Sequence, residues 1–250
     1  MEKNGQPAVN VKNLHKAFGP QTVLNGVDLT LESEETVVVL GRSGTGKSVT
    51  LRHIVRLILP DRGRVFVEGD EISALEGPDL SRVRRGIGFL FQNAALFDSI
   101  SVGENVAFPL RRHTKLSDRE IKERATEKLA AVGLENEYET MPAALSGGMR
   151  KRAGLARALA LDPPIILVDE PSAGLDPITA DEIDTLLLKL KERGGTTLIV
   201  VTHNIPSARR LGDELVMLHE GRVIVQGTAA DLERSTEPMV RAFMSSQHSG

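Results

Sequence analysis

The chain has 250 residues, which suits one large α/β domain or one domain with a subdomain and is short for two full domains. Its 31 Lys and Arg residues against 34 Asp and Glu residues give a net charge of −3 without a long block of one sign, which argues against a dedicated nucleic-acid surface. The absence of cysteine excludes disulfides, thiolate catalysis and cysteine metal sites, and it fits a reducing compartment.

Met1 to Val11 contains no apolar core of the signal-peptide kind, and no run in the chain approaches the roughly 18 apolar residues of a membrane span. We therefore expect a soluble protein that reaches a membrane only through a partner.

The N-terminal part predicts an antiparallel sheet. Val9 to Leu14 and Val27 to Leu31 alternate with a period of two, as half-buried antiparallel strands do, and Gly63 to Val67 is a third such strand.

Four short, continuous apolar runs predict parallel strands that are buried on both faces. Helical segments separate them along the chain, which is typical of an α/β core. The runs are Val37 to Leu40, Ile87 to Phe91, Ile165 to Val168 and Leu198 to Val201.

A phosphate-binding loop follows the first of these runs. Gly41-Arg42-Ser43-Gly44-Thr45-Gly46-Lys47-Ser48 fits G-x-x-x-x-G-K-[ST] and precedes the predicted helix Val49 to Leu59. The glycines let backbone N–H groups surround a polyphosphate, Lys47 is placed to reach the β- and γ-phosphates, and Ser48 is a ligand for Mg²⁺. The alternative is a glycine-rich surface turn.

The stretch between Phe91 and Ile165 is predicted to be helical. Ser117 to Glu120 has the spacing of a capping box, and Gly133 ends the helix that follows it. The sequence therefore predicts a helical insertion at roughly 98–160.

The last part of the chain predicts a hairpin and short helices. Glu214 to Leu218 and Arg222 to Gln226 flank a turn at His219 to Gly221, and one or two short helices follow Thr228. We divide the chain into residues 1–227, which hold the core and the insertion, and a C-terminal helical tail, 228–250.

Two carboxylates end the apolar run Ile165 to Val168. Asp169 can hold the Mg²⁺ shell through water, and Glu170 can orient and partly deprotonate an attacking water. Such a pair alone is more often a solvated strand end, but with the phosphate loop upstream it predicts a catalytic pair.

A second candidate anion site precedes the predicted helix Arg150 to Leu161. In Leu145-Ser146-Gly147-Gly148-Met149, the serine and the glycine N–H groups would lie at the N-terminus of that helix. One nucleotide has only one γ-phosphate, so two such sites on one chain suggest that two chains share each ATP. The alternative is a serine-capped helix after a glycine turn.

The chain resembles the ATP-binding-cassette (ABC) ATPases over almost its whole length, from about Val9 to Gly227. The resemblance implies an α/β P-loop NTPase fold, with a RecA-like parallel sheet core, an antiparallel β subdomain and an inserted α-helical subdomain, and it implies ATP and Mg²⁺ as ligands. It is carried by six motifs that occur in the family's order: Gly41 to Ser48, Gln92, Leu145 to Met149, Asp169-Glu170, Ser172 to Asp176 and His203.

The resemblance also implies roles for single residues. Phe18 matches the aromatic residue that stacks on adenine, Val49 continues the ATP-binding loop, and Gln92 matches the glutamine that touches Mg²⁺ and the attacking water. His203 matches the histidine that contacts the γ-phosphate and orients the catalytic glutamate. Asp176 matches the loop that crosses the dimer interface, although Leu175-Asp176-Pro177 is also a helix-start signal.

One departure from the general ABC pattern points to a narrower group within the family. Most cassettes have glutamine where this chain has Met149, but Leu145 to Leu161 is similar to the ATPases of Mla-type phospholipid transporters, which work with mammalian-cell-entry (MCE) proteins. Phe91 to Phe97, Asn105 to Leu110 and Pro238 to Phe243 are similar to the same group. This resemblance implies a peripheral protein at the cytoplasmic face of the bacterial inner membrane. Its partners would be a second copy, membrane permease subunits, an MCE-type lipid-binding subunit and a small STAS-like regulatory subunit, with no nucleic acid.

Four alternatives stay open at this point. Ala94 to Phe97 either seats a helix of a membrane subunit or packs under the insertion, and Val240 and Phe243 cover the chain's own surface or reach the other copy. The transported substrate could be another one, such as amino acids. An ABC ATPase of nucleic-acid or translation type is a remote alternative, because the chain has neither a second cassette nor a long coiled-coil insertion.

Overall fold

The computed structural model describes residues 6–245 and divides the chain into two compact units. The first unit contains the chain up to Val83 and from Gly194 onward, and the second contains Arg84–Arg193. Within the part described, no helix is long and apolar enough to cross a membrane.

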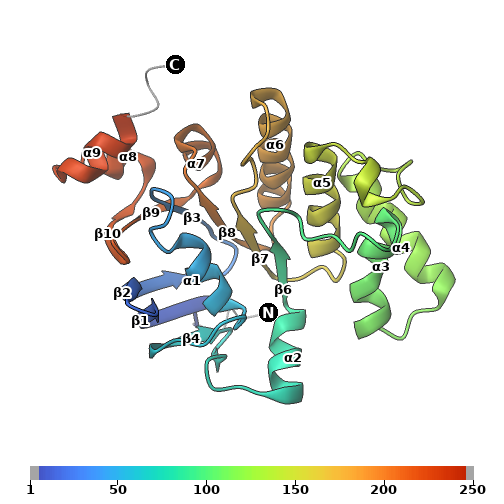
Figure 1. Ribbon diagram of the computed structural model, residues 1–250, viewed down its shortest axis with the longest axis horizontal. Helices are drawn as coiled ribbons and strands as arrows, with labels where there is room; N and C mark the ends of the chain where they lie inside the picture. The colour runs from blue at the N-terminus through green and yellow to red at the C-terminus, as the bar shows by residue number, and fades with distance from the viewer. Residues whose placement is uncertain (1–5, 246–250) are drawn as a thin grey trace. The chain divides into compact units, whose positions relative to one another are not determined.

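The first unit contains the predicted antiparallel sheet. Val9 lies opposite Leu31 on one side and opposite Val67 on the other, which confirms the three strands expected from the alternating sequence (Figure 1). The strands, in the spatial order β2-β1-β4-β5, are β2 (Gln21–Leu31), β1 (Val9–Phe18), β4 (Arg62–Val67) and β5 (Asp70–Glu71).

Strand β3 (Thr36–Leu40) lies between two parallel neighbours in this unit. It pairs in parallel with β8 (Thr197–Thr202) and with β9 (Glu214–His219). Every residue of β3 and β8 is buried, which explains why both read as continuous apolar runs. Strand β10 (Arg222–Gly227) is antiparallel to β9 and completes the predicted hairpin.

Helix α1 is shorter than the sequence predicts. It spans Lys47–Ile54 rather than Val49 to Leu59. Arg56 takes a left-handed conformation with φ of 54°, its N–H donates to His53 O at 2.9 Å, and Leu57 N–H donates to Arg52 O at 2.7 Å. This pair of bonds is a Schellman motif, whose left-handed position glycine usually occupies. Because arginine and not glycine occupies that position, the sequence contains no local signal for the end of the helix.

Short helices complete the first unit. Helix α7 (Ile205–Leu211) packs on β3 and β8, and the tail forms α8 (Ala229–Glu233) and α9 (Pro238–Ser245), as predicted. In Figure 1 the tail helices lie beside β10. Val240 is fully buried, so this side chain covers the chain's own surface. The end of the predicted tail, 246–250, lies outside the described residues.

The second unit places helices beside two parallel strands. Strands β6 (Ile87–Leu90) and β7 (Ile165–Asp169) pair in parallel, with Leu90 opposite Val168, as expected for buried runs. Helices α3, α4 and α5 contact one another in pairs, which confirms the helical character of the insertion (Figure 1). The helical elements are α2 (Gly77–Arg85), which spans the boundary between the two units in sequence, α3 (Val102–His113), α4 (Asp118–Ala131), the 3-10 turn η1 (Pro142–Ala144), α5 (Gly147–Ala158) and α6 (Pro177–Arg193).

The ends of the insertion helices follow from their capping residues. Ser117 and Glu120 form the predicted capping box of α4, and Gly133, with φ of 69°, follows its last turn. Helix α5 begins at Gly147, ahead of the run Arg150 to Leu161, with Ser146 and the glycines at its N-terminus as predicted. The hydroxyl of Ser146 accepts a hydrogen bond from Met149 N–H and caps the helix there.

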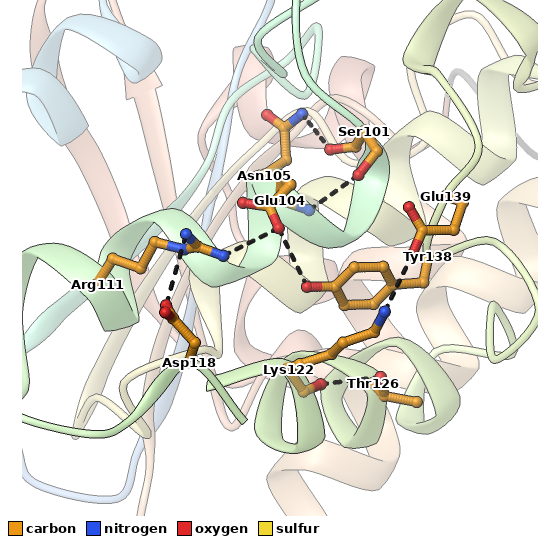
Figure 2. Close-up of polar contacts among 9 residues, drawn as sticks. All are labelled: Ser101, Glu104, Asn105, Arg111, Asp118, Lys122, Thr126, Tyr138 and Glu139. Carbon is orange, nitrogen blue, oxygen red and sulfur yellow. Dashed lines mark hydrogen bonds and ion pairs between the residues drawn. The ribbon is translucent and has the colours of Figure 1, made fainter. Parts of the chain in front are cut away.

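A polar network joins the insertion helices (Figure 2). The amide of the fully buried Asn105 accepts from Phe97 N–H at 2.7 Å and donates to the carbonyls of Phe97, Ile100 and Ser101 at 3.0 to 3.3 Å. Burial raises the pKa of the Tyr138 hydroxyl, which contacts the Glu104 carboxylate. Arg111 bridges the same carboxylate at 3.0 Å to Asp118.

Candidate active site

The predicted phosphate loop lies between β3 and α1, and its backbone suits an anion. Gly46 is the N-cap of α1 with φ of 98°, no side chain caps the helix, and its first turn contains no acidic residue. A Cβ on Gly46 would lie 2.5 Å from a methyl carbon of Leu24 and 2.9 Å from the carbonyl oxygen of Val23. Glycine is therefore required there for both its conformation and its size.

Lys47 lies across this loop. Its side chain is buried, and its ammonium donates to Gly41 O at 2.8 Å and to Arg42 O at 3.0 Å. Thr45 donates its hydroxyl to the same Arg42 carbonyl at 2.9 Å. The sequence prediction that Lys47 belongs to the loop agrees with this geometry, in which two loop carbonyls hold the ammonium.

Strand pairing brings His203 to the phosphate loop within the first unit. Leu40 lies opposite Thr202 in the parallel pair β3 and β8, so Gly41 and His203 leave the sheet side by side at the carboxyl ends of these strands. This edge is where α/β folds bind ligands. His203 is exposed there.

Phe18 ends strand β1 with its ring 48% exposed. The Lys16 ammonium lies 5.5 Å from the ring centroid and forms an ion pair with Asp61 at 2.8 Å. This hydrogen bond lowers the pKa of the Asp61 carboxyl, which also accepts from Ala17 N–H at 2.7 Å. Sequence reasoning missed Lys16 and Asp61, because residues far apart in the chain give no local signal of this contact.

The second unit brings Gln92 to the two carboxylates. Because Leu90 lies opposite Val168, Gln92 and the pair Asp169 and Glu170 leave the ends of β6 and β7 at one edge. Gln92 is exposed, whereas the two carboxylate residues are buried. Glu170 has φ of 45°, a left-handed conformation that is uncommon for a residue with a side chain and that concentrates at functional sites.

Lys151 is a further buried residue of this site. Its ammonium donates to the backbone carbonyl of Glu170 at 2.9 Å, and its side chain is almost fully buried. Burial lowers the pKa of this ammonium, while the charges of Asp169 and Glu170 act in the opposite direction. The sequence analysis missed Lys151 because it lies in the basic run Arg150 to Arg152. Its helical phase, three residues after Gly148 and four before Leu155, marks the buried face of α5.

The predicted signature motif begins α5. The Ser146 hydroxyl caps the helix at 3.2 Å from Met149 N, and Ser146 and Gly147 are exposed. A Cβ on Gly148 would overlap the Thr179 methyl group, so the first turns of α5 and α6 touch. Asp176 accepts from Thr179 N–H at 3.1 Å and from its hydroxyl at 2.6 Å, as the helix-start signal predicts, and this hydroxyl bond lowers the pKa of Asp176.

The residues present fit a magnesium ion carried by the nucleotide. Across residues 6–245 no group of three or more His, Asp or Glu side chains forms a metal site. Mg²⁺ keeps most of its water and binds proteins through one or two side chains plus phosphate oxygens. The side chains that the sequence predicts for it are Ser48, Gln92 and Asp169.

An apolar groove of about 350 Å³ lies in the second unit near Gln92. Phe97 and Phe108 line it with their rings 5.1 Å apart and nearly half exposed, whereas Ala94 is buried. The Arg157 guanidinium also lines it and donates to Ala94 O at 2.7 Å and to Ala95 O at 2.6 Å. The stretch Ala94 to Phe97 therefore both packs on the insertion and presents apolar surface.

Comparisons with known proteins agree with this geometry. The ABC transporter family profile matches residues 24–173. The chain is 42% identical over 243 residues to the probable ribonucleotide transport ATP-binding protein mkl of Mycobacterium tuberculosis, covering 97% of this chain and 68% of mkl. It is 36% identical over 244 residues to MlaF, the intermembrane phospholipid transport system ATP-binding protein of Escherichia coli, covering 98% of this chain and 91% of MlaF.

A solved structure shares the fold. The dimeric ATP-binding cassette MJ0796 in a post-hydrolysis state, bound to ADP and Pi, matches with a TM-score of 0.82 and 37% identity, over 88% of this chain and 98% of MJ0796. The family profile covers more than half of the chain, and the relatives match it nearly end to end. The chain therefore belongs to the ABC transporter family and is an ATP-binding, ATP-hydrolysing subunit of a transporter.

Proposed function

We propose that this ATPase powers phospholipid transport through a membrane complex of the MCE/Mla type. The observation that carries the substrate class is the 36% identity to MlaF, which extends over 98% of this chain and 91% of MlaF. Met149, where most cassettes have glutamine, supports the same assignment.

Each predicted site residue has a role in the proposed hydrolysis of ATP. Lys47 and the N–H groups of the phosphate loop hold the phosphates and stabilise the charge that develops on them. Glu170 takes the proton of the attacking water, with Gln92 and His203 orienting the water and the γ-phosphate. Mg²⁺, held by Ser48, Gln92 and, through water, Asp169, would neutralise phosphate charge. Phe18 offers its exposed ring to the adenine.

Two copies of the chain would share each nucleotide. The exposed start of α5 at Ser146 and Gly147 is a second anion-binding helix terminus, distinct from the phosphate loop. In a head-to-tail dimer this terminus faces the nucleotide on the other copy's loop, and Asp176 lies at the interface. The dimeric state of MJ0796 supports this arrangement. ATP binding closes the dimer, and hydrolysis reopens it.

The membrane connection would run through the apolar groove. Half-exposed Phe97 and Phe108 suit the apolar face of an amphipathic helix, and we assign that helix to a permease subunit. The chain would then be peripheral, at the cytoplasmic face of the bacterial inner membrane. An MCE-type lipid-binding subunit and a small STAS-like regulatory subunit would complete the complex.

The shared site is tested by the Glu170→Gln variant. Removing the base should reduce turnover to a small residual rate but leave ATP binding intact, so ATP should trap a stable dimer that light scattering detects. The same variant without ATP is the control. A variant that stays monomeric at saturating ATP contradicts the shared site, and one that turns over ATP at the wild-type rate contradicts the role of Glu170.

The substrate class is tested by purifying the native membrane complex and identifying its subunits by mass spectrometry. We expect an MCE protein among them. Ribonucleotide transport is the second candidate, because the chain is 42% identical to mkl, a probable ribonucleotide transport ATP-binding protein. A complex that contains a soluble substrate-binding protein, for ribonucleotides or for amino acids, and no MCE protein would overturn phospholipid transport.

A further inference from the structure

The buried ammonium of Lys151 makes a contact that has no role in the chemistry of hydrolysis proposed above. Its ammonium donates to the carbonyl oxygen of Glu170 at 2.9 Å, and the side chain of Lys151 is only 5% exposed. Burying an ammonium is costly unless a specific polar contact compensates for it. The partner of this costly group is the backbone of the proposed catalytic residue.

The backbone of Glu170 needs such a contact, because its conformation is unfavourable. A φ of 45° for a non-glycine residue persists only where the surroundings enforce it. Glu170 O also accepts from Ala173 N–H at 3.2 Å. Two donors on one carbonyl fix the orientation of the peptide that follows Glu170, and so fix the direction in which its side chain leaves the end of β7.

The position of Lys151 along α5 connects this contact to the signature motif. Ser146 caps α5, and Lys151 lies five residues further along, about 7.5 Å by the rise of an α-helix. A continuous helix transmits a shift of its first turn to Lys151 with little loss. Any ligand that binds at Ser146 and Gly147 therefore acts on the group that holds Glu170.

We propose that Lys151 is a positioning residue that holds Glu170 in its hydrolytic orientation and couples the two ATP sites of the dimer. This rests on the proposed function, in which Ser146 contacts the ATP of one site and Glu170 serves the ATP of the other. Binding of one nucleotide to the start of α5 sets, through Lys151, the orientation of the base at the second nucleotide. Hydrolysis at the two sites is thereby cooperative.

The test compares steady-state ATP turnover of the full chain with that of Lys151→Met, which keeps the length of the side chain but removes its charge and its donor. We expect kcat to fall about tenfold or more, as for a misplaced catalytic group, with KM for ATP within about twofold of wild type. The Hill coefficient should fall from near two, the number of sites, toward one. Lys151→Arg, which keeps a charged donor, should recover part of kcat and of the cooperativity.

Lys128→Met is the matched control. Lys128 is also a largely buried helical lysine of the second unit, but its ammonium pairs with Asp162. Its removal should leave kcat and the Hill coefficient unchanged. If Lys151→Met does not fold, Lys151→Gln replaces the ammonium with a shorter, neutral donor. This variant should lose cooperativity while it still binds ATP.

A double-mutant cycle separates this inference from the proposed function. If Lys151 acts through Glu170, Lys151→Met should not lower the residual rate of Glu170→Gln further. Equal fold losses in both backgrounds, or an unchanged kcat in the single variant, would overturn the role of Lys151. A Glu170→Gln variant with wild-type turnover would instead overturn the proposed function, whatever Lys151→Met does.

Discussion

At the scale of single residues, Met149 contributes its backbone N–H to the cap of helix α5. Its N–H donates to the Ser146 hydroxyl at 3.2 Å, a contact that any residue other than proline can make. We therefore expect Met149→Gln to keep ATP turnover within a few-fold of wild type, measured by phosphate release. A loss approaching that of Glu170→Gln would show that the methionine side chain itself takes part in the site.

The sequence predicted those parts of the candidate site whose residues lie close together in one motif. Gly41 to Ser48 needed only local spacing, because a loop between a strand and a helix fixes where those groups point. Asp169-Glu170 was predicted only together with that loop upstream. Lys151 and Arg157 could not be predicted in the same way. Each is a basic residue on a helix, and the carbonyls that give it a role belong to Glu170 and to the turn at Ala94, far away in the sequence.

At the scale of secondary-structure elements, Asn105 connects helix α3 to the segment before it (Figure 2). We expect Asn105→Ala to lower the free energy of unfolding by about 2–4 kcal/mol, because it removes the amide that accepts from Phe97 N–H and donates to the carbonyls of Phe97 and Ile100. Chemical denaturation followed by circular dichroism measures this change. Thr126→Ala, on an exposed side chain that bonds only its own helix, is the control and should change little.

Helix capping predicts how stability depends on pH. Hydrogen bonds from Ser117, Thr179 and Thr228 lower the pKa values of the carboxyls of Glu120, Asp176 and Asp231. Because the pKa values in the folded state lie below those in the unfolded state, this stability is present above about pH 4.5 and is lost as the pH falls through the folded values.

The melting temperature should therefore fall as the pH is lowered from 5 to 3, measured by calorimetry. The amide variants Glu120→Gln, Asp176→Asn and Asp231→Asn, combined, should flatten this fall. Glu35 works in the opposite direction, since burial raises its pKa. A melting temperature that falls equally in the combined variant would show that other groups control the acid transition.

The type of each element followed from sequence periodicity, whereas some boundaries did not. The parallel strands and the hairpin were predicted because apolar runs and turn residues are local signals. The end of α1 was misplaced because a left-handed Arg56 ends this helix before the apolar pattern does.

At the scale of the whole molecule, a head-to-tail dimer predicts complementation between two inactive chains. A Lys47→Ala chain lacks the phosphate loop's cation, and a Ser146→Arg chain has a blocked signature. A dimer of the two carries both defects at one site and none at the other. We expect the mixture to regain ATPase activity that neither variant has alone.

The matched control mixes Lys47→Ala with Glu170→Gln. Because the loop and the base of one chain serve the same nucleotide in the proposed dimer, each site of this mixture keeps one defect, and the mixture should stay inactive. Activity in the control, or none in the first mixture, would show that sites are not shared in the proposed way.

Helix α5 makes three contacts that must hold at once. Ser146 caps its start, Lys151 reaches Glu170, and Arg157 reaches the carbonyls of Ala94 and Ala95. One residue inserted between the first and the last of these would turn everything beyond it by about 100° around the helix axis. Side chains along this segment can be exchanged singly, but its length cannot change. We therefore expect working relatives of this chain to differ here by substitution and never by insertion or deletion.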